Sequence, residues 1–82
     1  MVAYKKKILK KVNVDPGVSL GVYSVYVSDQ EFYVVTLEYK GWSIPLSTGY
    51  TPWGAVALAT VSPWAKDSEK IQKALAVLSQ VI

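Results

Sequence analysis

Two runs of residues rich in Val and Tyr, separated by a short polar segment, constrain the fold of this chain most strongly. Residues 18–28 and 31–39 flank Asp29-Gln30, and this pattern is typical of a β-hairpin with a two-residue turn. A second two-residue turn, Lys40-Gly41, leads into a further strand over residues 42–46. The two registers follow from different turns, yet both place the same side chains on one face: Tyr33, Val35, Leu37 and Tyr39. This agreement predicts an antiparallel meander.

A strand over residues 5–14 is predicted to precede this hairpin, because lysine and apolar residues alternate along it. Asp15-Pro16-Gly17 then provides a tight turn, since Pro fixes one φ and Gly accepts a positive one. Alternation directs Ile8, Val12 and Val14 toward one face of the sheet, although Leu9 and Lys10 violate the pattern. It directs the following residues toward the other: Lys5, Lys7, Leu9 and Lys11.

The last third of the chain is predicted to be helical. Thr51-Pro52 and Ser62-Pro63 each resemble a helix N-cap followed by proline at the first helical position. Residues 51–61 fit either a short helix or a fifth strand, whereas residues 62–82 show an apolar stripe of helical period. Core packing is expected for all three tryptophans: Trp42, Trp53 and Trp64.

The predicted fold is therefore of the α+β class, in a single domain over residues 1–82. A four-stranded antiparallel β-meander spans residues 1–47, and an amphipathic C-terminal helix over residues 62–82 packs on one of its faces. If residues 51–61 are helical, a short helix precedes it. Pro45 cannot donate a backbone hydrogen bond, so the fourth strand is expected at an edge of the sheet.

The residue types present exclude most familiar catalytic sites. The chain has no Cys and no His, which rules out thiol nucleophiles, imidazole chemistry and zinc sites built from these ligands. Of its six carboxylates only Glu38 lies in the middle of a strand, and the inferred registers bring no two of them together as an acid–base pair. The sequence therefore predicts a protein that is not an enzyme and that uses no cofactor and no metal.

The positive charge comes entirely from lysine. Nine lysines and no arginine, against six acidic residues, give a net charge of +3, and lysine lacks the planar fork that reads guanine. The longest nearly apolar run, residues 53–61, is about half as long as a membrane span requires. Lysines near the start of the chain interrupt the apolar region that a signal peptide would need. We therefore expect a cytoplasmic protein without a membrane partner. The absence of Cys and the scarcity of Asn and Met also suit a thermophilic source.

The sheet face turned away from the predicted helix is the candidate functional surface. Ammonium groups can follow phosphates while aromatic rings stack on bases, so lysines beside rings suit single-stranded or double-stranded nucleic acid. The candidate contacts are Lys5, Lys7, Lys11, Tyr23 and Phe32. Lysines on an edge strand also prevent edge-to-edge aggregation, and this is the purely structural explanation for them.

Apolar residues on the same face suggest a second function. Val25, Val27 and Val34 would be poorly placed in water, so we expect a homodimer through this face, or contact with another protein. An inhibitor of a host or viral machine would belong to this class. The two hypotheses are thus a small basic nucleic-acid-binding protein of low sequence specificity and a non-enzymatic interaction or assembly module. Salt dependence separates them, because only phosphate contacts weaken steeply with added salt.

The order of the predicted elements resembles the transcriptional coactivator family of single-stranded-DNA binders. Residues 39–44, which lead toward helix, are similar to that family's last strand, and the resemblance implies a dimer that binds DNA on its sheet. Residues 48–61 depart from the pattern, because in that family the helix follows the strand directly. Residues 21–59 are also similar in outline to the three-stranded DNA-binding domain of plant regulators and phage integrases, whose sheet uses arginines that this chain does not have.

Overall fold

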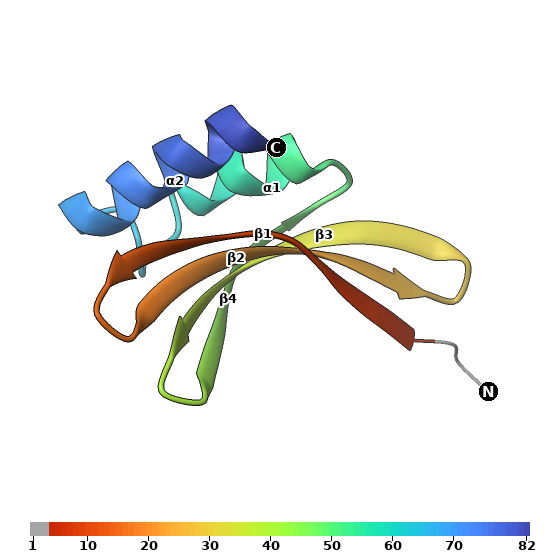
Figure 1. Ribbon diagram of the computed structural model, residues 1–82. Coiled ribbons are helices and arrows are strands. Elements are labelled where there is room, and N and C mark those ends of the chain that lie inside the picture. The colour runs from red at the N-terminus through yellow and green to blue at the C-terminus, as the bar shows by residue number, and fades with distance from the viewer. Residues whose placement is uncertain (1–3) are drawn as a thin grey trace.

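The computed structural model describes residues 4–82, in which four strands precede two helices (Figure 1). The strands pair in the order β1-β2-β3-β4, each antiparallel to the next, and both helices lie against the same face of the sheet. This confirms the predicted α+β meander. The elements are β1 (Tyr4–Asp15), β2 (Val18–Val27), β3 (Gln30–Tyr39), β4 (Trp42–Gly49), α1 (Pro52–Ala59) and α2 (Glu69–Val81).

The turn between β2 and β3 lies one residue earlier than predicted. Ser28 and Asp29 form it with φ values of 50° and 65°, which is the left-handed conformation of the two-residue turns that match strand twist. Leu20 therefore pairs with Leu37, and Val22 with Val35. The register differs from the predicted one by two residues, so every side chain of β2 and β3 remains on its predicted face.

The core lies between the helices and the face of the sheet that they cover. Leu20 and Val22 of β2 and Val35 of β3 are fully buried there, and each such side chain contributes roughly 1.5–3 kcal/mol. Leu37, which shares the predicted face with Val35, and Ile44 opposite it in β4 are only half-buried. The helical residues that complete the core are Ala55, Val56, Ala59, Ile71, Ala74, Leu75 and Leu78.

Residues 51–61 contain a helix rather than a fifth strand. The Thr51 hydroxyl accepts a hydrogen bond of 2.9 Å from the backbone N–H of Gly54, and Pro52 occupies the first helical position, as predicted. The hydroxyl of Ser47 in β4 donates to the carbonyl of Ala55, which ties α1 to that strand.

The second helix begins at Glu69, so the predicted start at Ser62-Pro63 is wrong. The N-cap is Ser68, whose hydroxyl accepts from the backbone N–H of Ile71 at 3.3 Å. Residues 60–68 instead form turns, which the Gln72 side chain holds by donating to the carbonyls of Thr60 and Ala65. The side-chain cap at position 68 and these two hydrogen bonds favour a short helix with a structured connection over one long helix.

The three tryptophans do not pack in the core. Trp42, Trp53 and Trp64 are 72%, 64% and 60% exposed, which contradicts the prediction. Trp53 lies on the outer side of α1, and Trp64 falls in the connection that replaces the first turns of the predicted helix. Trp42 pairs with Tyr39 beside the turn between β3 and β4, where neither residue is covered by a helix. The exposure of Trp42 and Trp64 follows from helices that are shorter than predicted, whereas Trp53 is exposed because it lies on the side of α1 opposite the buried Ala55, Val56 and Ala59.

The difference in length between the helices and the sheet leaves one end of the sheet uncovered. The eight residues of α1 span about 12 Å, whereas a ten-residue strand spans about 33 Å. Figure 1 shows the turn between β2 and β3 and the start of β1 projecting beyond the helical layer. We call this part the open end of the sheet; it consists of residues 5–7, 24–27 and 30–33.

Candidate nucleic-acid interface

A β-bulge at Leu9 decides where the lysines of β1 lie. Ile8 pairs with Tyr23, but the next paired residue is Lys10, opposite Val22, so Leu9 is the extra residue. A bulge of one residue exchanges the two faces of the strand on one side of it. The alternation predicted through residues 5–14 is therefore broken in its middle.

The predicted lysine set is consequently divided between the two faces. Lys5 and Lys7 pair with Tyr26 and Ser24, on the face that carries the helices, so their predicted placement is wrong. Lys11 pairs with Gly21 and lies, as predicted, on the face turned away from the helices, which we call the reverse face. The full distribution is Lys5, Lys7 and Lys10 on the helix-bearing face, with Lys6 and Lys11 on the reverse face.

Tyr23, predicted to stack on bases, is already held by its neighbours on the reverse face. Its hydroxyl donates to Glu38 at 2.7 Å, and the ammonium nitrogen of Lys6 lies 4.2 Å from the centre of its ring. Its ring also packs on Gly21, where a Cβ would come within 2.8 Å of it. Lys11 lies 3.5 Å from the same Glu38 carboxylate. Tyr23 therefore presents no free ring to a base.

The environment of Tyr23 also stabilises its protonated form. Partial burial, together with the hydrogen bond to Glu38 and the charge of that carboxylate, raises the pKa of Tyr23 to about 12. The phenol thus remains a hydrogen-bond donor under all mild conditions. This cluster, formed by Lys6, Lys11, Gly21, Tyr23 and Glu38, fastens β1 to the reverse face of β2 and β3.

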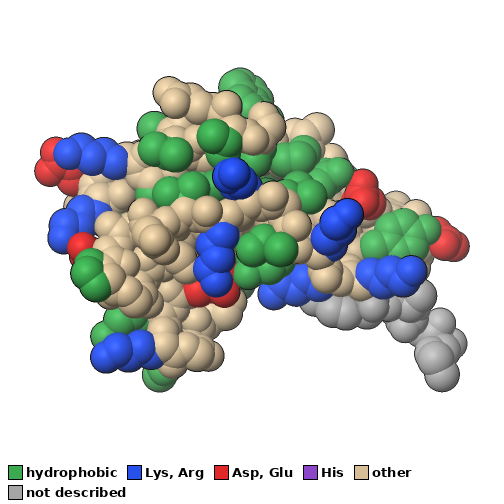
Figure 2. All heavy atoms as spheres, viewed as in Figure 1, with side chains coloured by type: hydrophobic (Ala, Val, Ile, Leu, Met, Phe, Trp, Pro, Cys, Tyr) green, Lys and Arg blue, Asp and Glu red, His purple; other side chains and the backbone are tan. Residues whose placement is uncertain are grey.

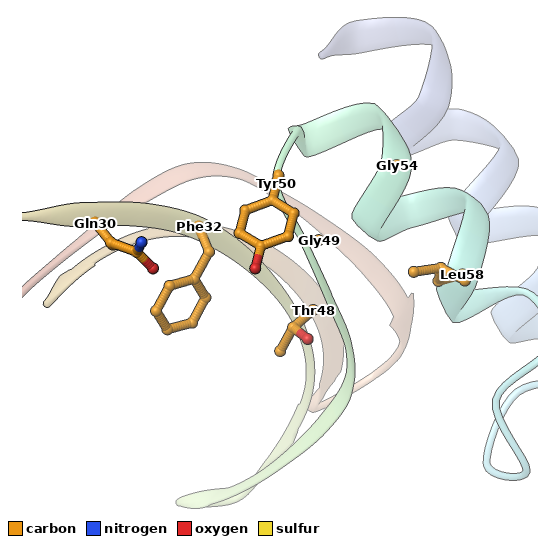
Figure 3. Close-up of a pocket in the computed structure, with 7 residues that line it drawn as sticks. All are labelled: Gln30, Phe32, Thr48, Gly49, Tyr50, Gly54 and Leu58. Carbon is orange, nitrogen blue, oxygen red and sulfur yellow. The ribbon is translucent and has the colours of Figure 1, made fainter.

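The structure does not bring Phe32 near the lysines. Phe32 pairs with Val25 of β2, whose other neighbour is Lys6 of β1, so two strand spacings, roughly 10 Å, separate Phe32 from β1. Figure 3 shows its ring on the inner side of the arched sheet, in a hollow that Thr48 and Tyr50 also line. Phe32 therefore shares the reverse face with Lys6 and Lys11 but lies two strands away from β1.

The proposed protein contact on the reverse face is less exposed than expected. Val25 is only 5% exposed, and Val27 and Val34 are half-buried. Neither α1 nor α2 covers this face, which is the inner, concave side of the arched sheet (Figure 1). The need for a partner to cover these valines is correspondingly small.

The open end of the sheet contains a polar hollow that the sequence did not indicate. Lys5, Lys7, Ser24, Tyr26 and Glu31 line it, and it has a volume of about 460 Å³. Glu31 accepts hydrogen bonds from Ser24 at 3.0 Å and from Tyr33 at 2.9 Å. The hydrogen bond between Tyr33 and Glu31 is the main cause that raises the pKa of Tyr33. Tyr26, which is 37% exposed, lies on the same face as Lys5 and Lys7 in the strand next to β1, and Tyr33 lies on this face one strand further away.

The sequence contains no signal that exposes Tyr26, because a helix over residues 62–82 would span about 31 Å and cover most of a ten-residue strand of about 33 Å. The helix that forms, α2, has thirteen residues and spans about 20 Å, so part of the covered face remains open.

The charge of β1 is largely unpaired. Its five lysines from Lys5 to Lys11 are all exposed, and Lys11 is the one that forms an ion pair with another residue of the described chain. Elsewhere, Lys70 pairs with Asp15 at 2.9 Å and Lys73 lies 4.0 Å from Glu69. Figure 2 shows lysine side chains spread over the side of the molecule on which β1 lies, with apolar side chains gathered over the helices.

Comparison with protein-family models, with curated protein sequences and with solved structures finds no match for this chain. Within residues 4–82, neither helix has the length and apolar character needed to cross a membrane. The same residues contain no cluster of three acidic side chains suited to a metal ion. The charge and shape of the surfaces described above are therefore the basis for a functional assignment.

Proposed function

We propose that this chain binds nucleic acid with low sequence specificity, through the lysines of β1, and that it acts without catalysis. The observation that carries the proposal is the unpaired charge on one edge strand. Lys5, Lys6, Lys7 and Lys10 are exposed and form no ion pair with other described residues. They extend over roughly 17 Å of strand.

The arrangement suits a phosphate backbone that runs along the edge of the sheet. Ammonium groups reach out from both faces of β1, so a backbone lying against the edge can be approached from two sides. Duplex DNA carries one charge per about 1.7 Å of its axis, so phosphates outnumber the lysines over this length. Each lysine that meets a phosphate releases a condensed counterion, which supplies the free energy of binding.

Base recognition contributes little in this proposal. The chain contains no arginine for bidentate contact with guanine. The ring of Tyr23 already contacts Lys6 and Gly21, and Phe32 lies two strands away from β1. Tyr26, beside Lys5 on the open end of the sheet, is the ring best placed to stack on a base of a single strand. Lys11 contributes less than the other lysines, because Glu38 already neutralises it.

The alternative function, a protein contact through the reverse face, has weaker support. That face is concave, its most central valine is closed off, and its charged residues pair with one another. Lysines on β1 would also protect the sheet edge without any ligand. A binding experiment distinguishes this protective role from nucleic-acid binding.

The test is fluorescence anisotropy with labelled single-stranded and duplex DNA and RNA at low salt. Lys5→Gln, Lys7→Gln and Lys10→Gln together should weaken binding at least tenfold, because three phosphate contacts are lost. The matched control replaces Lys40, Lys66 and Lys73 by Gln, which removes the same charge from other elements. Equal weakening by both triple variants, or no binding by the unaltered protein, would overturn the proposal.

A further inference from the structure

We propose that the outer side of α1 is a self-association surface, which pairs with the same surface of a second copy of this chain. The helix has no charged residue, and only one of its sides is buried in the core. Trp53 and Leu58 on its other side are 64% and 53% exposed, while Tyr50 before it and Val61 after it are 83% and 69% exposed. We call these four residues the α1 patch.

Such a helix is unusual at a water-exposed surface. A helix that is apolar on every side is normally covered on every side, and monomeric proteins rarely expose large contiguous apolar areas. The rings of Tyr50 and Trp53 alone offer roughly 300 Å², given their exposure and about 150–250 Å² for a fully buried ring. Each partner in a stable dimer buries about 800 Å², of which these rings would supply a substantial part.

The surface around the α1 patch has an exposed side chain, Trp53, on one flank of the helix and a hollow on the other. A hollow of about 530 Å³ lies between the end of β4 and one flank of α1, and no charged residue lines it. In Figure 3, Phe32, Tyr50 and Leu58 border this space. Trp53 lies on the opposite flank of the helix, beside the shallow groove that α1 forms with α2.

This combination suits a two-fold axis. When such an axis runs parallel to α1, it sets one flank of the helix against the opposite flank of its copy. The exposed Trp53 of each copy then faces the uncharged hollow of the other. The same surface thus provides both halves of the contact, as an isologous interface requires.

Charge favours a second copy at this surface over the other surfaces of the molecule. A chain with a net charge of +3 repels its own copy, and β1 would bring lysines face to face. The α1 patch contains none. Pairing of sheet edges is disfavoured as well, because β1 carries lysines and a bulge, and β4 carries Pro45 and a bulge near Leu46.

Charge also argues against a lipid surface as the occupant. Peripheral helices that bind membranes combine apolar residues with lysines on one side, so that anionic headgroups add to the attraction. Here α1 lies over β4 and β3, whereas α2 is the helix that packs on β1. The lysine strand is therefore at the opposite edge of the sheet from the α1 patch, and one flat membrane would not meet both.

The experiment is sedimentation equilibrium of the full chain up to high micromolar concentration. The unaltered protein should form dimers, and Trp53→Gln with Leu58→Gln should be monomeric at every concentration, while circular dichroism shows that it remains folded. The matched control, Val77→Gln with Val81→Gln, removes two similarly exposed apolar residues from α2 and should still dimerise.

Three results would overturn the proposal. One is a monomeric unaltered protein at the highest concentration. Another is a Trp53→Gln, Leu58→Gln variant that dimerises as well as the unaltered chain. The third is flotation of the unaltered protein, still monomeric, with vesicles of anionic phospholipid, which would identify a lipid surface as the occupant.

Discussion

β1 is the most charged element of this molecule, whereas α1 has no charged residue, and the two lie at opposite edges of the sheet. β1 carries five lysines in twelve residues, whereas α1 carries no charged residue in eight. Both belong to one sheet-and-helix core: β1 is an edge strand that packs against α2, whereas α1 covers β3 and β4. Their exposed sides nevertheless suit opposite kinds of partner.

The difference shows how one small core can support two independent surfaces. Salt weakens contacts between lysines and phosphates, but it has little effect on apolar contacts. Binding through β1 and association through α1 should therefore respond differently to ionic strength. Substitutions that affect one surface should leave the other intact, provided that the shared core is preserved.

The largest effect is expected from damage to that shared core. Leu75 is 1% exposed, and Leu75→Ala should lower the free energy of unfolding by about 2–5 kcal/mol, because it leaves a cavity. Urea unfolding followed by circular dichroism measures the loss. Two separate transitions, or a loss below 1 kcal/mol, would show that β1 and α1 do not rest on one cooperative core.

A smaller effect is expected where β1 is fastened to the reverse face. Tyr23→Phe removes the donor to Glu38 and should cost about 1–2 kcal/mol. Since folding raises the pKa of Tyr23 from 10.0 to about 12, its contribution to stability is complete below pH 10 and is lost as the pH rises toward 12. The unaltered protein should therefore lose more stability over this range than Tyr23→Phe. The control is Tyr50→Phe, since that hydroxyl is exposed; an identical pH dependence of Tyr23→Phe and the unaltered chain would contradict the assignment.

A comparable or slightly smaller effect is expected at the start of α1. Thr51→Ala removes the hydroxyl that accepts from Gly54 and should cost about 1 kcal/mol in thermal or urea unfolding. Thr51→Ser keeps an acceptor and should lose less. Equal free energies of unfolding for Thr51→Ala and Thr51→Ser would show that the side-chain cap does not stabilise the start of α1.

The smallest effects on stability are expected on the two exposed surfaces themselves. Leu58→Gln on α1 and Lys7→Gln on β1 should each change the free energy of unfolding of the monomer by no more than about 0.5 kcal/mol. Measurements in dilute solution avoid any contribution from association. A large loss in either variant would mean that the residue supports the fold rather than a partner.

The sequence predicted the fold better than it predicted these surfaces, for a different reason in each region. In β1 the alternation is interrupted at Leu9 and Lys10, and the extra residue, Leu9, reverses the faces of Lys5 and Lys7. A bulge has no reliable signature in one sequence, and it moves every residue beyond it. Lys11, on the other side of the bulge, was placed correctly.

The sequence of α1 shows no alternation between polar and apolar side chains. Without polar residues on one side, periodicity distinguishes neither helix from strand nor buried from exposed, so Trp53 was assigned to the core. The cap at Thr51-Pro52 was the informative signal. In α2, by contrast, charged and apolar residues alternate with helical period, and Leu75 and Leu78 on the predicted apolar stripe are buried.

Whether the unpaired charge on β1 binds nucleic acid is shown by the salt dependence of binding by the unaltered protein. Anisotropy of a labelled single strand, measured over a range of salt concentrations, yields the slope of log K against log salt. With about 0.7 per phosphate contact and the four unpaired lysines of β1, the predicted slope is about −3. A slope near zero, or no binding at the lowest salt concentration, would contradict the account.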